Sequence, residues 1–348
     1  MAGGGGTRFW PLSRKKLPKQ FLNLTGKDRM VNLTFDRLAR FVDPEDIFVV
    51  TNQMHADLTE EFMEGRIGQD HILAEPAARN TAACIGYAAM EILKKYGDGM
   101  MCILASDHYI RDEDTYVSVM QEAVRTAEET DALVTIGIHP TFPSTGYGYI
   151  RHVMLADKPY RKVEEFVEKP DLATAQAYVE DGRYAWNSGM FVWKASTILK
   201  YFEKLLPDIY DCLCRIGEAL GTPDEKRVIA QVYPNIPKIS IDYGIMERAD
   251  RVLMLVGDFG WNDIGSFDTL PSVLTADENG NVCRGNHILL DSKGCICYAK
   301  DRLITTIGVE NLVVVETPDA VLVCPKDRVQ EVKKIVEQLE HDGREEYL

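Results

Sequence analysis

The chain opens with MAGGGGTRFWPLSRKKLPKQFLNLTGK (residues 1–27), in which a glycine run precedes a set of basic residues. This segment contains no Asp or Glu, although the whole chain carries a formal net charge of −15. Glycines let backbone N–H groups approach an anion closely because no Cβ is in the way, and basic side chains can bind the outer charges of that anion. The segment therefore predicts a polyphosphate site in an otherwise acidic protein.

Three other interpretations of the glycine run can be compared with this one. A glycine run at a terminus is, by itself, typical of a flexible end. A Walker A loop requires Gly-Lys-Ser/Thr after its glycines, and Gly6-Thr7-Arg8 does not provide it. A dinucleotide-binding fingerprint requires a third glycine where Arg8 and Phe9 stand. Neither motif is present.

Length and composition limit the class of protein. A chain of 348 residues predicts about two domains, and 45% hydrophobic and 27% charged residues are ordinary for a globular protein. No apolar run approaches the ~18 residues that span a bilayer, and no signal-peptide pattern opens the chain. We therefore expect a cytoplasmic protein with no membrane partner. The acidic balance disfavours nucleic-acid binding, and eight cysteines without a Cys-x-x-Cys motif indicate reduced thiols.

Strand and helix patterns alternate through residue 140. Apolar runs predict strands at 47–51, 71–74, 101–105 and 133–138, and helical spacing predicts helices at 56–63, 80–95 and 114–129. This alternation is typical of an α/β fold with a Rossmann-like, mostly parallel sheet flanked by helices. Active sites in such sheets lie at the carboxyl ends of strands.

The order of elements changes after residue 145. We expect strands at 149–154 and 163–168, helices at 171–181 and 195–206, and a polar helical segment near 208–232. Short apolar strands follow at 287–290, 295–298, 303–306, 312–316 and 320–324, and a helix at 326–340 ends the chain. The spacing of these five strands is typical of a small β-roll, β-helix or meander. The predicted domains are residues 1–275, divided near residue 140, and a β-rich domain at 280–348.

Two aspartates directly follow predicted buried strands. Asp107 comes after MCILAS (101–106), and Asp263 lies in GDFGWNDIG (257–265) after the strand 252–256. Each alone could be an ordinary turn aspartate. Together with the glycine loop they suggest a Mg²⁺ site, because Mg²⁺ usually takes one or two carboxylates together with phosphate oxygens.

Five further segments place polar or small residues next to predicted strands or helices. They are EPAARNT (75–81), TGYGY (145–149), FVEKP (166–170), WNSGMF (186–191) and SIDYGIME (240–247). Each has an ordinary structural interpretation: a helix N-cap at Asn80 or Thr81, a hairpin loop, a solvated Glu-Lys pair, a turn, and packing at a helix start. For the last segment we expect packing and support more than direct chemistry.

The segments together resemble the sugar-nucleotide pyrophosphorylase family. The pattern Gly-Gly-x-Gly-Thr-Arg…Pro-Lys carries the resemblance, and WPLSR (10–14) with PKQF (18–21) narrows it to the mannose-1-phosphate guanylyltransferase branch. Six separated motifs cover the chain from Ala2 to the C-terminal helix. One departure is that family members place a short apolar strand before the glycines, whereas this sequence starts at Met1. The resemblance implies a nucleotidyltransferase-type domain and a C-terminal left-handed β-helix-like domain.

The resemblance also implies transfer of GMP from GTP to α-D-mannose 1-phosphate, giving GDP-mannose and pyrophosphate by Mg²⁺-assisted in-line attack. Residues 1–140 would serve GTP and residues 141–275 the sugar phosphate, and Glu75 would accept hydrogen bonds from guanine. The implied catalytic residues are Arg8, Lys19 and Lys169, and the implied metal ligands are Asp107 and Asp263. The implied nucleotide-binding residues are Ala2, Gly3, Gly4, Gly6, Thr7, Glu75, Arg79, Asn80 and Ser106. The implied sugar-phosphate-binding residues are Gly148, Glu168, Lys169 and Asn187.

Two other functions stay open at this stage. The same chemistry could act on another sugar 1-phosphate or nucleoside triphosphate, or the chain could be a weakly catalytic paralogue that binds nucleotide sugars. The C-terminal strands resemble the β-helix through which relatives pack, so we expect a possible homodimer. Some relatives also carry a second, isomerase domain, which we do not expect in a sequence of 348 residues.

Overall fold

The computed structural model describes residues 1–348 and divides into two compact units. The first unit consists of Met1 and residues 37–105 and 112–261, and the second of residues 2–36, 106–111 and 262–348. Each unit is therefore assembled from segments that are far apart in the sequence. None of the helices combines the length and the apolar character that crossing a membrane requires.

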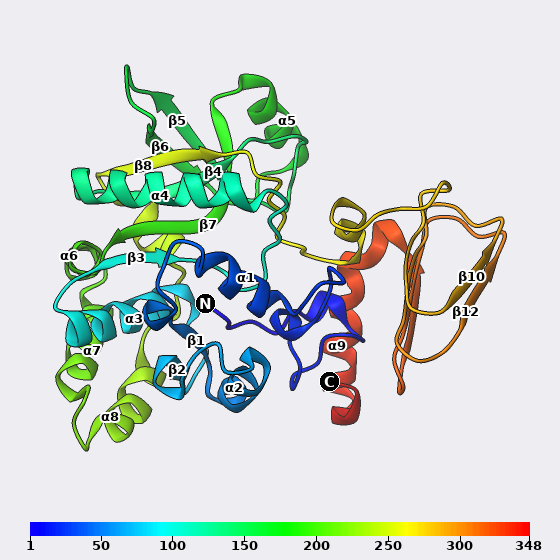
Figure 1. The fold of residues 1–348 in the computed structure, drawn as a ribbon, viewed down its shortest axis with the longest axis horizontal. Coiled ribbons are helices and arrows are strands. Elements are labelled where there is room, and N and C mark those ends of the chain that lie inside the picture. The colour runs from blue at the N-terminus through cyan, green and yellow to red at the C-terminus, as the bar shows by residue number, and fades with distance from the viewer. The chain divides into compact units, whose positions relative to one another are not determined.

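A six-stranded sheet forms the framework of the first unit (Figure 1). Its strands, in spatial order, are β3 (Met100–Ile103), β7 (Tyr184–Lys194), β4 (Leu133–Ile138), β8 (Val252–Gly257), β6 (Arg161–Val167) and β5 (Tyr149–Met154). Every residue of β4 is buried, as expected for a central strand covered on both faces. A separate parallel pair is formed by β1 (Val49–Asn52) and β2 (Ile72–Glu75).

Helices pack against this sheet and against each other. Helix α4 contacts β4, β7 and β8, while α3, α6 and α7 contact one another. Helix α4 begins where the Asp112 side chain accepts a hydrogen bond from the Thr115 N–H at 3.0 Å, and it ends at Asp131 in the left-handed conformation. The helix bounds are α1 (Met30–Leu38), α2 (Ala56–Met63), α3 (Asn80–Tyr96), α4 (Glu113–Thr130), α5 (Leu172–Asp181), α6 (Ala195–Leu205), α7 (Pro207–Ala219) and α8 (Glu225–Val232).

The predicted α/β class is confirmed, but the pairing inside the six-stranded sheet differs from the expected mostly parallel one. Strand β7 lies between β3 and β4 and is antiparallel to both, so β4–β8 is the parallel pair of this sheet. The chain places this long strand between two strands that precede it by many residues. Strand–helix alternation along the first 140 residues carries no signal for such a later insertion.

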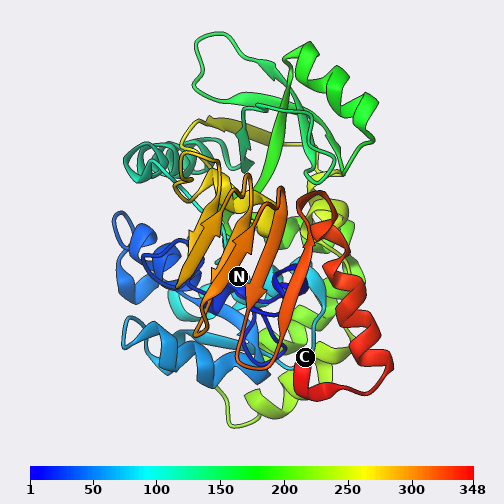
Figure 2. The same ribbon diagram turned by 90° about the vertical axis from the view of Figure 1, so that its right-hand side faces the viewer.

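The second unit contains a small parallel β-helix. Strands β9 (Val282–Arg284), β11 (Ile296–Ala299) and β13 (Leu312–Glu316) pair in parallel, and so do β10 (His287–Leu290) and β12 (Ile304–Ile307). Strand β14 (Val321–Pro325) adds to β13 in the antiparallel direction, and helix α9 (Val332–His341) follows. Figure 2 shows these strands side by side. Of the three arrangements that the strand spacing left open, the β-helix is therefore the one observed, and the roll and the meander are not.

The N-terminal segment and the β-helix share one hydrophobic core in the second unit. Phe9 and Trp10 belong to the same buried cluster as Phe267 of the 267–272 turn and Val313 of β13. The rings of Phe9 and Phe267 meet edge to face, with centroids 4.9 Å apart. This packing fixes the polypeptide that directly follows the glycine run.

A buried carboxylate closes one turn of the β-helix. The Glu316 side chain is 4% exposed, and its Oε2 accepts the backbone N–H groups of Lys300, Asp301 and Arg302 at 3.0, 3.1 and 3.1 Å. The Arg302 guanidinium donates to Oε1 at 2.9 Å. Burial acts to raise the pKa of Glu316, but these N–H donors and the Arg302 charge outweigh it and hold the pKa below its ordinary value.

Replacing Glu316 by Gln is expected to lower the free energy of unfolding by about 1–3 kcal/mol at neutral pH, because a charged acceptor of several N–H groups is lost. A depressed carboxyl pKa stabilises the fold above the ordinary pKa of 4.5, and this contribution disappears as the pH falls through the folded-state pKa. The difference between wild type and Glu316→Gln in denaturant unfolding should therefore shrink in acid. Glu310→Gln, at an exposed position, is the control. An equal loss of unfolding free energy in this control, or a loss in Glu316→Gln that does not depend on pH, would refute this account.

Candidate active site

The glycine run of the second unit forms an exposed loop that is closed against Lys19. Gly6 has φ 55°, in the left-handed region, and directly precedes the short 3-10 helix Thr7–Phe9. A Cβ on Gly6 would lie 2.4 Å from the Cβ of Lys19, so only glycine fits this contact. The Ser13 hydroxyl donates to the Gly6 carbonyl at 2.6 Å.

The start of the loop is also fixed by hydrogen bonding. The Gln20 side chain donates to the carbonyl of Ala2 at 2.6 Å, and both residues are buried. The glycines between Ala2 and Gly6 and the residues Thr7 and Arg8 are exposed. The loop therefore presents its backbone to solvent while both of its ends are held, which is an arrangement suited to anion binding.

The Lys19 ammonium connects the loop to both predicted metal ligands. Its Nζ lies 2.9 Å from Oδ2 of Asp107 and 2.5 Å from the backbone carbonyl oxygen of Asp263, and the side chain is 7% exposed. Desolvation acts to raise the pKa of Asp107, but the charges of Lys19 and His108 outweigh it and the pKa lies below its ordinary value. Asp107 is therefore an ionised carboxylate at neutral pH.

The segments that carry Asp107 and Asp263 are joined by their backbones. Tyr109 and Asn262 exchange two hydrogen bonds, N–H to O at 2.8 and 3.0 Å, in an isolated antiparallel bridge. The side chain of Asn262 also accepts the N–H of Ile264 at 2.6 Å. Because of this bridge, the two carboxylate-bearing turns that sequence analysis singled out come together in one unit.

The carboxylate oxygens of Asp107 and Asp263 are of the type that binds Mg²⁺. No group of three or more His, Cys, Asp and Glu side chains that could enclose a metal ion is present. Two carboxylates on turns that Lys19 joins to the glycine loop match the preference of Mg²⁺, which takes one or two carboxylates and completes its shell with water and substrate phosphates.

Arg8 lies beside the Asp263 turn. Its Nη1 is 3.5 Å from the Gly265 carbonyl oxygen, and a Cβ on Gly265 would lie 3.4 Å from Nη1 and 3.1 Å from Oδ2 of Asp263. Ile264, between Asp263 and Gly265, adopts φ 42°, which is a strained backbone conformation for a β-branched residue. Ser106, on the other turn, is buried, and its carbonyl accepts from the Thr34 hydroxyl at 3.2 Å.

The predicted sugar-phosphate residues meet just before β5, just after β6 and within β7 in the first unit. A Cβ on Gly148 would lie 2.6 Å from Oε2 of Glu168 and 3.5 Å from Cβ of Asn187, so the glycine leaves room for both side chains. Lys169 has φ 42° and its ammonium donates to Oε1 of Glu168. The Lys169 side chain is 58% exposed and can reach a ligand in solvent.

A buried aspartate orients Asn187. The Asn187 Nδ2 donates to Oδ1 of Asp242 at 2.8 Å, its Oδ1 accepts the Gly189 N–H at 3.1 Å, and its backbone N–H donates to the Gly148 carbonyl at 2.8 Å. Burial raises the pKa of Asp242 and the nearby charge of Glu168 adds to this, although the hydrogen bond from Asn187 opposes it. Asn187 is thus fixed at both ends of its amide.

Aromatic rings surround the same strand ends. The ring of Tyr147 meets those of Trp186 and Trp261 with centroids 5.1 and 5.2 Å away, and Phe142 contacts Trp186 at 4.8 Å. Apolar ring faces next to fixed hydrogen-bonding groups are typical of sugar-binding sites.

The predicted base-recognition turn contains a buried carboxylate with a partner. Glu75 ends β2, and Tyr233 donates its hydroxyl proton to Oε1 of Glu75. Burial raises the pKa of Glu75, against the opposing effect of this hydrogen bond. The second oxygen of the carboxylate is not engaged by Tyr233.

The rest of this turn leads into helix α3. The Arg79 guanidinium donates to the Pro234 carbonyl, while its Nε is buried without a hydrogen-bond partner. Asn80 is exposed with φ 66°, and its side chain accepts the Thr81 N–H at 2.8 Å. The helix begins at Asn80, as its apolar spacing predicted, but the expected N-cap at Asn80 or Thr81 is wrong, because Arg79 occupies the N-cap position and makes no side-chain capping hydrogen bond.

Two partners were not among the predicted site residues. Tyr233 pairs with Glu75 from 158 residues away, and no local pattern marks it. Asp242 lies in the SIDYGIME segment, for which supporting packing was expected, and the signal that could have identified it is an acidic residue at the start of an otherwise apolar helical turn.

The chain matches known proteins along nearly its whole length. Residues 1–280 match the nucleotidyl transferase family model, and residues 285–339 match the model described as the MannoseP isomerase/GMP-like beta-helix domain. The xanthan biosynthesis protein XanB of Xanthomonas campestris pv. campestris (strain B100) is 43% identical over 347 residues, which are 99% of this chain and 73% of that protein. The mannose-1-phosphate guanylyltransferase of Escherichia coli (strain K12) is 42% identical over 356 residues, which cover 100% of this chain and 74% of that protein.

Comparison with a solved structure shows that the similarity extends to the fold. The protein from Thermus thermophilus, described as a mannose-1-phosphate geranyltransferase, superposes with a TM-score of 0.90 at 36% sequence identity and covers 98% of both chains. Sequence and structure agree over both the α/β unit and the β-helix. The chain therefore belongs to the mannose-1-phosphate guanylyltransferase family of nucleotidyl transferases.

Proposed function

We propose that this chain transfers GMP from GTP to α-D-mannose 1-phosphate, with GDP-mannose and pyrophosphate as products. The observation that carries the proposal is the position of Lys19, whose ammonium contacts Asp107 and the Asp263 backbone beside the exposed glycine loop. The family relationship, and the name of the relative from Escherichia coli, support the choice of substrates.

The triphosphate is assigned to the second unit. The backbone N–H groups of the loop from Gly3 to Gly6 bind phosphate oxygens, with Ala2 and Thr7 at its two ends. Lys19 has three N–H donors, of which two are directed at Asp107 and Asp263, so one remains for a phosphate oxygen. Arg8 is exposed and binds the leaving pyrophosphate bidentately.

Asp107 and Asp263 would hold Mg²⁺, and Ser106 supports this turn. When bound, the ion supplies positive charge that stabilises the phosphate oxygens of both substrates. The carboxylates themselves must be ionised for this purpose, and the low pKa of Asp107 ensures this at neutral pH.

The sugar phosphate is assigned to residues of the first unit. The Lys169 ammonium binds the 1-phosphate as a point charge, Glu168 and the Asn187 amide bind sugar hydroxyls, and Gly148 gives the sugar access to the backbone. Asp242 acts on the sugar only through Asn187, whose amide it orients.

The reaction needs no protein nucleophile. An oxygen of the sugar 1-phosphate attacks the α-phosphorus of GTP, a P–O bond forms, and pyrophosphate leaves from the opposite side with the electron pair of the broken bond. Both reactants are anions, so the contribution of the protein is to position them and to neutralise their charge.

Selection of guanine is assigned to Glu75 and its turn, with Arg79 and Asn80. The Glu75 oxygen that Tyr233 leaves available accepts hydrogen bonds from the ring N–H and the exocyclic amine of guanine. Adenine does not present this pair of donors, so a buried acceptor would remain unpaired with ATP.

We expect Asp263→Asn to retain the fold and to reduce kcat for pyrophosphate release by at least about a hundredfold. The reason is that the variant lacks the carboxylate charge that would hold Mg²⁺ beside the phosphates. The measurement is pyrophosphate release at saturating Mg²⁺, with circular dichroism as a check of folding. Asp258→Asn, an exposed carboxylate five residues earlier, is the matched control and should keep wild-type activity. Unchanged turnover of Asp263→Asn would rule out the assignment.

Removing the Lys169 ammonium should affect one substrate more than the other. Lys169→Ala is expected to raise the KM for mannose 1-phosphate about tenfold to a hundredfold, since a charge-assisted contact to phosphate is lost, and to change the KM for GTP much less. Lys162→Ala removes an exposed lysine of β6 and serves as the control. A larger effect on GTP would show that Lys169 binds the other substrate.

We further propose that two copies associate through the outer face of the β-helix. Leu290 of β10 and Ile307 of β12 are paired in register, and their side chains are 53% and 72% exposed. Val321 and Val323 of β14, which belongs to the other sheet of this domain, are also exposed. Neighbouring exposed apolar side chains such as Leu290 and Ile307 are typical of protein interfaces.

Sedimentation equilibrium tests this association. The wild type should sediment at twice the mass of one chain, and Ile307→Lys should shift it to the single-chain mass because a charge is then buried in the contact. Leu172→Lys, which charges an exposed apolar residue of α5 in the first unit, should have no effect. A wild type that is monomeric at high concentration would contradict the proposal.

A further inference from the structure

The β-helix holds two free cysteines on neighbouring strands. Cys283 of β9 and Cys297 of β11 are partners in register in a parallel pair, so their side chains lie on the same face of the sheet. The apolar cluster in which they pack also contains Ile304 of β12, from the other sheet, so both thiols face the inside of the β-helix. Adjacent strands lie about 4.8 Å apart, within the Cα separation of roughly 4.4–6.8 Å that a disulfide bridges.

Cys283 is the thiol of this pair that a small reagent can reach. Strand β9 is the last strand of its sheet, and Cys283 is half-buried, whereas Cys297 is 1% exposed. A hydrogen bond from the Cys297 thiol holds the pKa of Cys283 below its ordinary value, against the effect of burial, while the pKa of Cys297 is raised. The charge of His287 also lowers the pKa of Cys283, and that of Asp277 opposes it. Cys283 therefore has the character of a nucleophile, with a second thiol directly beside it.

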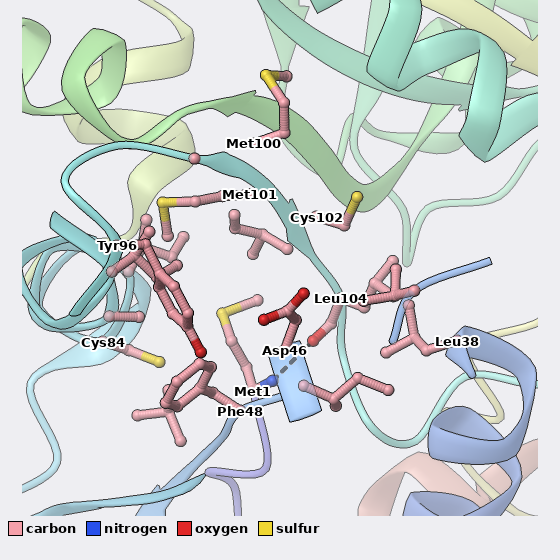
Figure 3. A pocket seen from close by; sticks show the side chains of 18 of the residues that line it. Met1, Leu38, Asp46, Phe48, Cys84, Tyr96, Met100, Met101, Cys102 and Leu104 are labelled. Atoms are coloured by element: carbon pink, nitrogen blue, oxygen red, sulfur yellow. Dashed lines mark hydrogen bonds between the residues drawn. The ribbon is translucent and has the colours of Figure 1, made fainter. Parts of the chain in front are cut away.

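Cys295, Cys84 and Cys102 lie in different surroundings. The buried Cys295 Sγ is directed at the carbonyl oxygens of Lys293 and Val309, at 3.4 and 3.7 Å. Figure 3 shows Cys84 and Cys102 beside a cavity of the first unit that is lined mainly by apolar and aromatic side chains. Burial raises the pKa of each of these two thiols to about 12, so both stay protonated and react slowly at neutral pH.

We propose that Cys283 and Cys297 form a modification site that a hydroperoxide oxidises to a disulfide. The Cys283 thiolate attacks one oxygen of the hydroperoxide, an S–O bond forms, the O–O bond breaks, and the leaving oxygen takes up a proton as an alcohol or as water. The Cys297 sulfur then attacks the Cys283 sulfur, an S–S bond forms, and the hydroxyl of the sulfenic acid leaves with the Cys297 proton as water. The two thiols lose two electrons, and the hydroperoxide gains them.

This disulfide joins the first two turns of the β-helix. The same two strands supply Val282 and Ile296 to the buried cluster that contains Phe9 and Trp10, so the bond stiffens the sheet on which the N-terminal segment packs. Closing a loop between two residues of the chain also removes conformational freedom from the unfolded state. The oxidised protein is therefore more resistant to unfolding than the reduced one.

Peptide mapping of the full chain tests the proposed site. The reduced protein is treated with an equimolar amount of hydrogen peroxide, the remaining thiols are blocked with N-ethylmaleimide, and trypsin is added without a reductant. Trypsin cuts after Arg and Lys, so the expected disulfide joins peptides 252–284 and 294–300, and fragmentation of the second peptide distinguishes Cys297 from Cys295. We expect this disulfide to be the main product, with Cys84 and Cys102 oxidised at least about tenfold more slowly than Cys283.

Single substitutions assign the role of each sulfur. Cys297→Ser should abolish the disulfide and leave Cys283 as a sulfenic acid that dimedone traps, and Cys283→Ser should abolish both products. Cys295→Ser, two residues from Cys297, is the matched control and should form the disulfide like the wild type. A wild type that forms no bond between Cys283 and Cys297, or a Cys297→Ser variant that forms as much disulfide as the wild type, would overturn the inference.

The melting temperature tests whether the bond fits the folded β-helix. The oxidised wild type should melt at least about 2 °C above the reduced protein, and dithiothreitol should reverse the change. Peroxide treatment of Cys297→Ser should give no such increase. A lower melting temperature of the oxidised wild type would contradict the in-register placement of the two cysteines and would also overturn the inference.

Discussion

The contact on which the proposed phosphate chemistry depends is that of Lys19 with Asp107 and the backbone of Asp263. A chain with a net charge of −15 repels anionic substrates unless positive charge is held in a fixed place. The Lys19 ammonium is nearly buried, and its carbon chain is also the surface against which Gly6 closes. One side chain therefore shapes the candidate anion-binding loop and holds two candidate metal-binding turns together, within a single compact unit.

The pKa values of three candidate-site carboxylates are shifted in opposite directions. Lys19 keeps the pKa of Asp107 low, as a ligand for a cation requires. In contrast, burial raises the pKa of Glu75 and of Asp242, and each carboxylate accepts a hydrogen bond from a neutral side chain, Tyr233 or Asn187. The Glu75 carboxylate keeps the capacity to accept hydrogen bonds from a neutral ligand, which suits the proposed contact with a nucleobase, whereas Asp242 orients the Asn187 amide.

The sequence was sufficient to predict those features that depend on local pattern. Asp107 and Asp263 were singled out because each follows a predicted buried strand, and their role as metal ligands stays a prediction. Five strand ranges close to those of β10–β14 were predicted from regular spacing. The antiparallel insertion of β7, the pairing of Tyr233 with Glu75 and the bond from Asn187 to Asp242 were not predicted, because each joins residues about 50 or more positions apart. The strained Ile264 and Lys169 were also missed, since neither residue type favours positive φ and only the surrounding structure can impose it.

The central claim is the reaction itself, and a substrate panel tests it most directly. Pyrophosphate release would be measured with GTP, ATP or UTP, each combined with mannose 1-phosphate or glucose 1-phosphate, in the presence of Mg²⁺. The account predicts release that requires GTP and is fastest with mannose 1-phosphate. Release that is equally fast with ATP, or that prefers glucose 1-phosphate, would contradict the proposed specificity, and no release with any pair would contradict the proposed reaction.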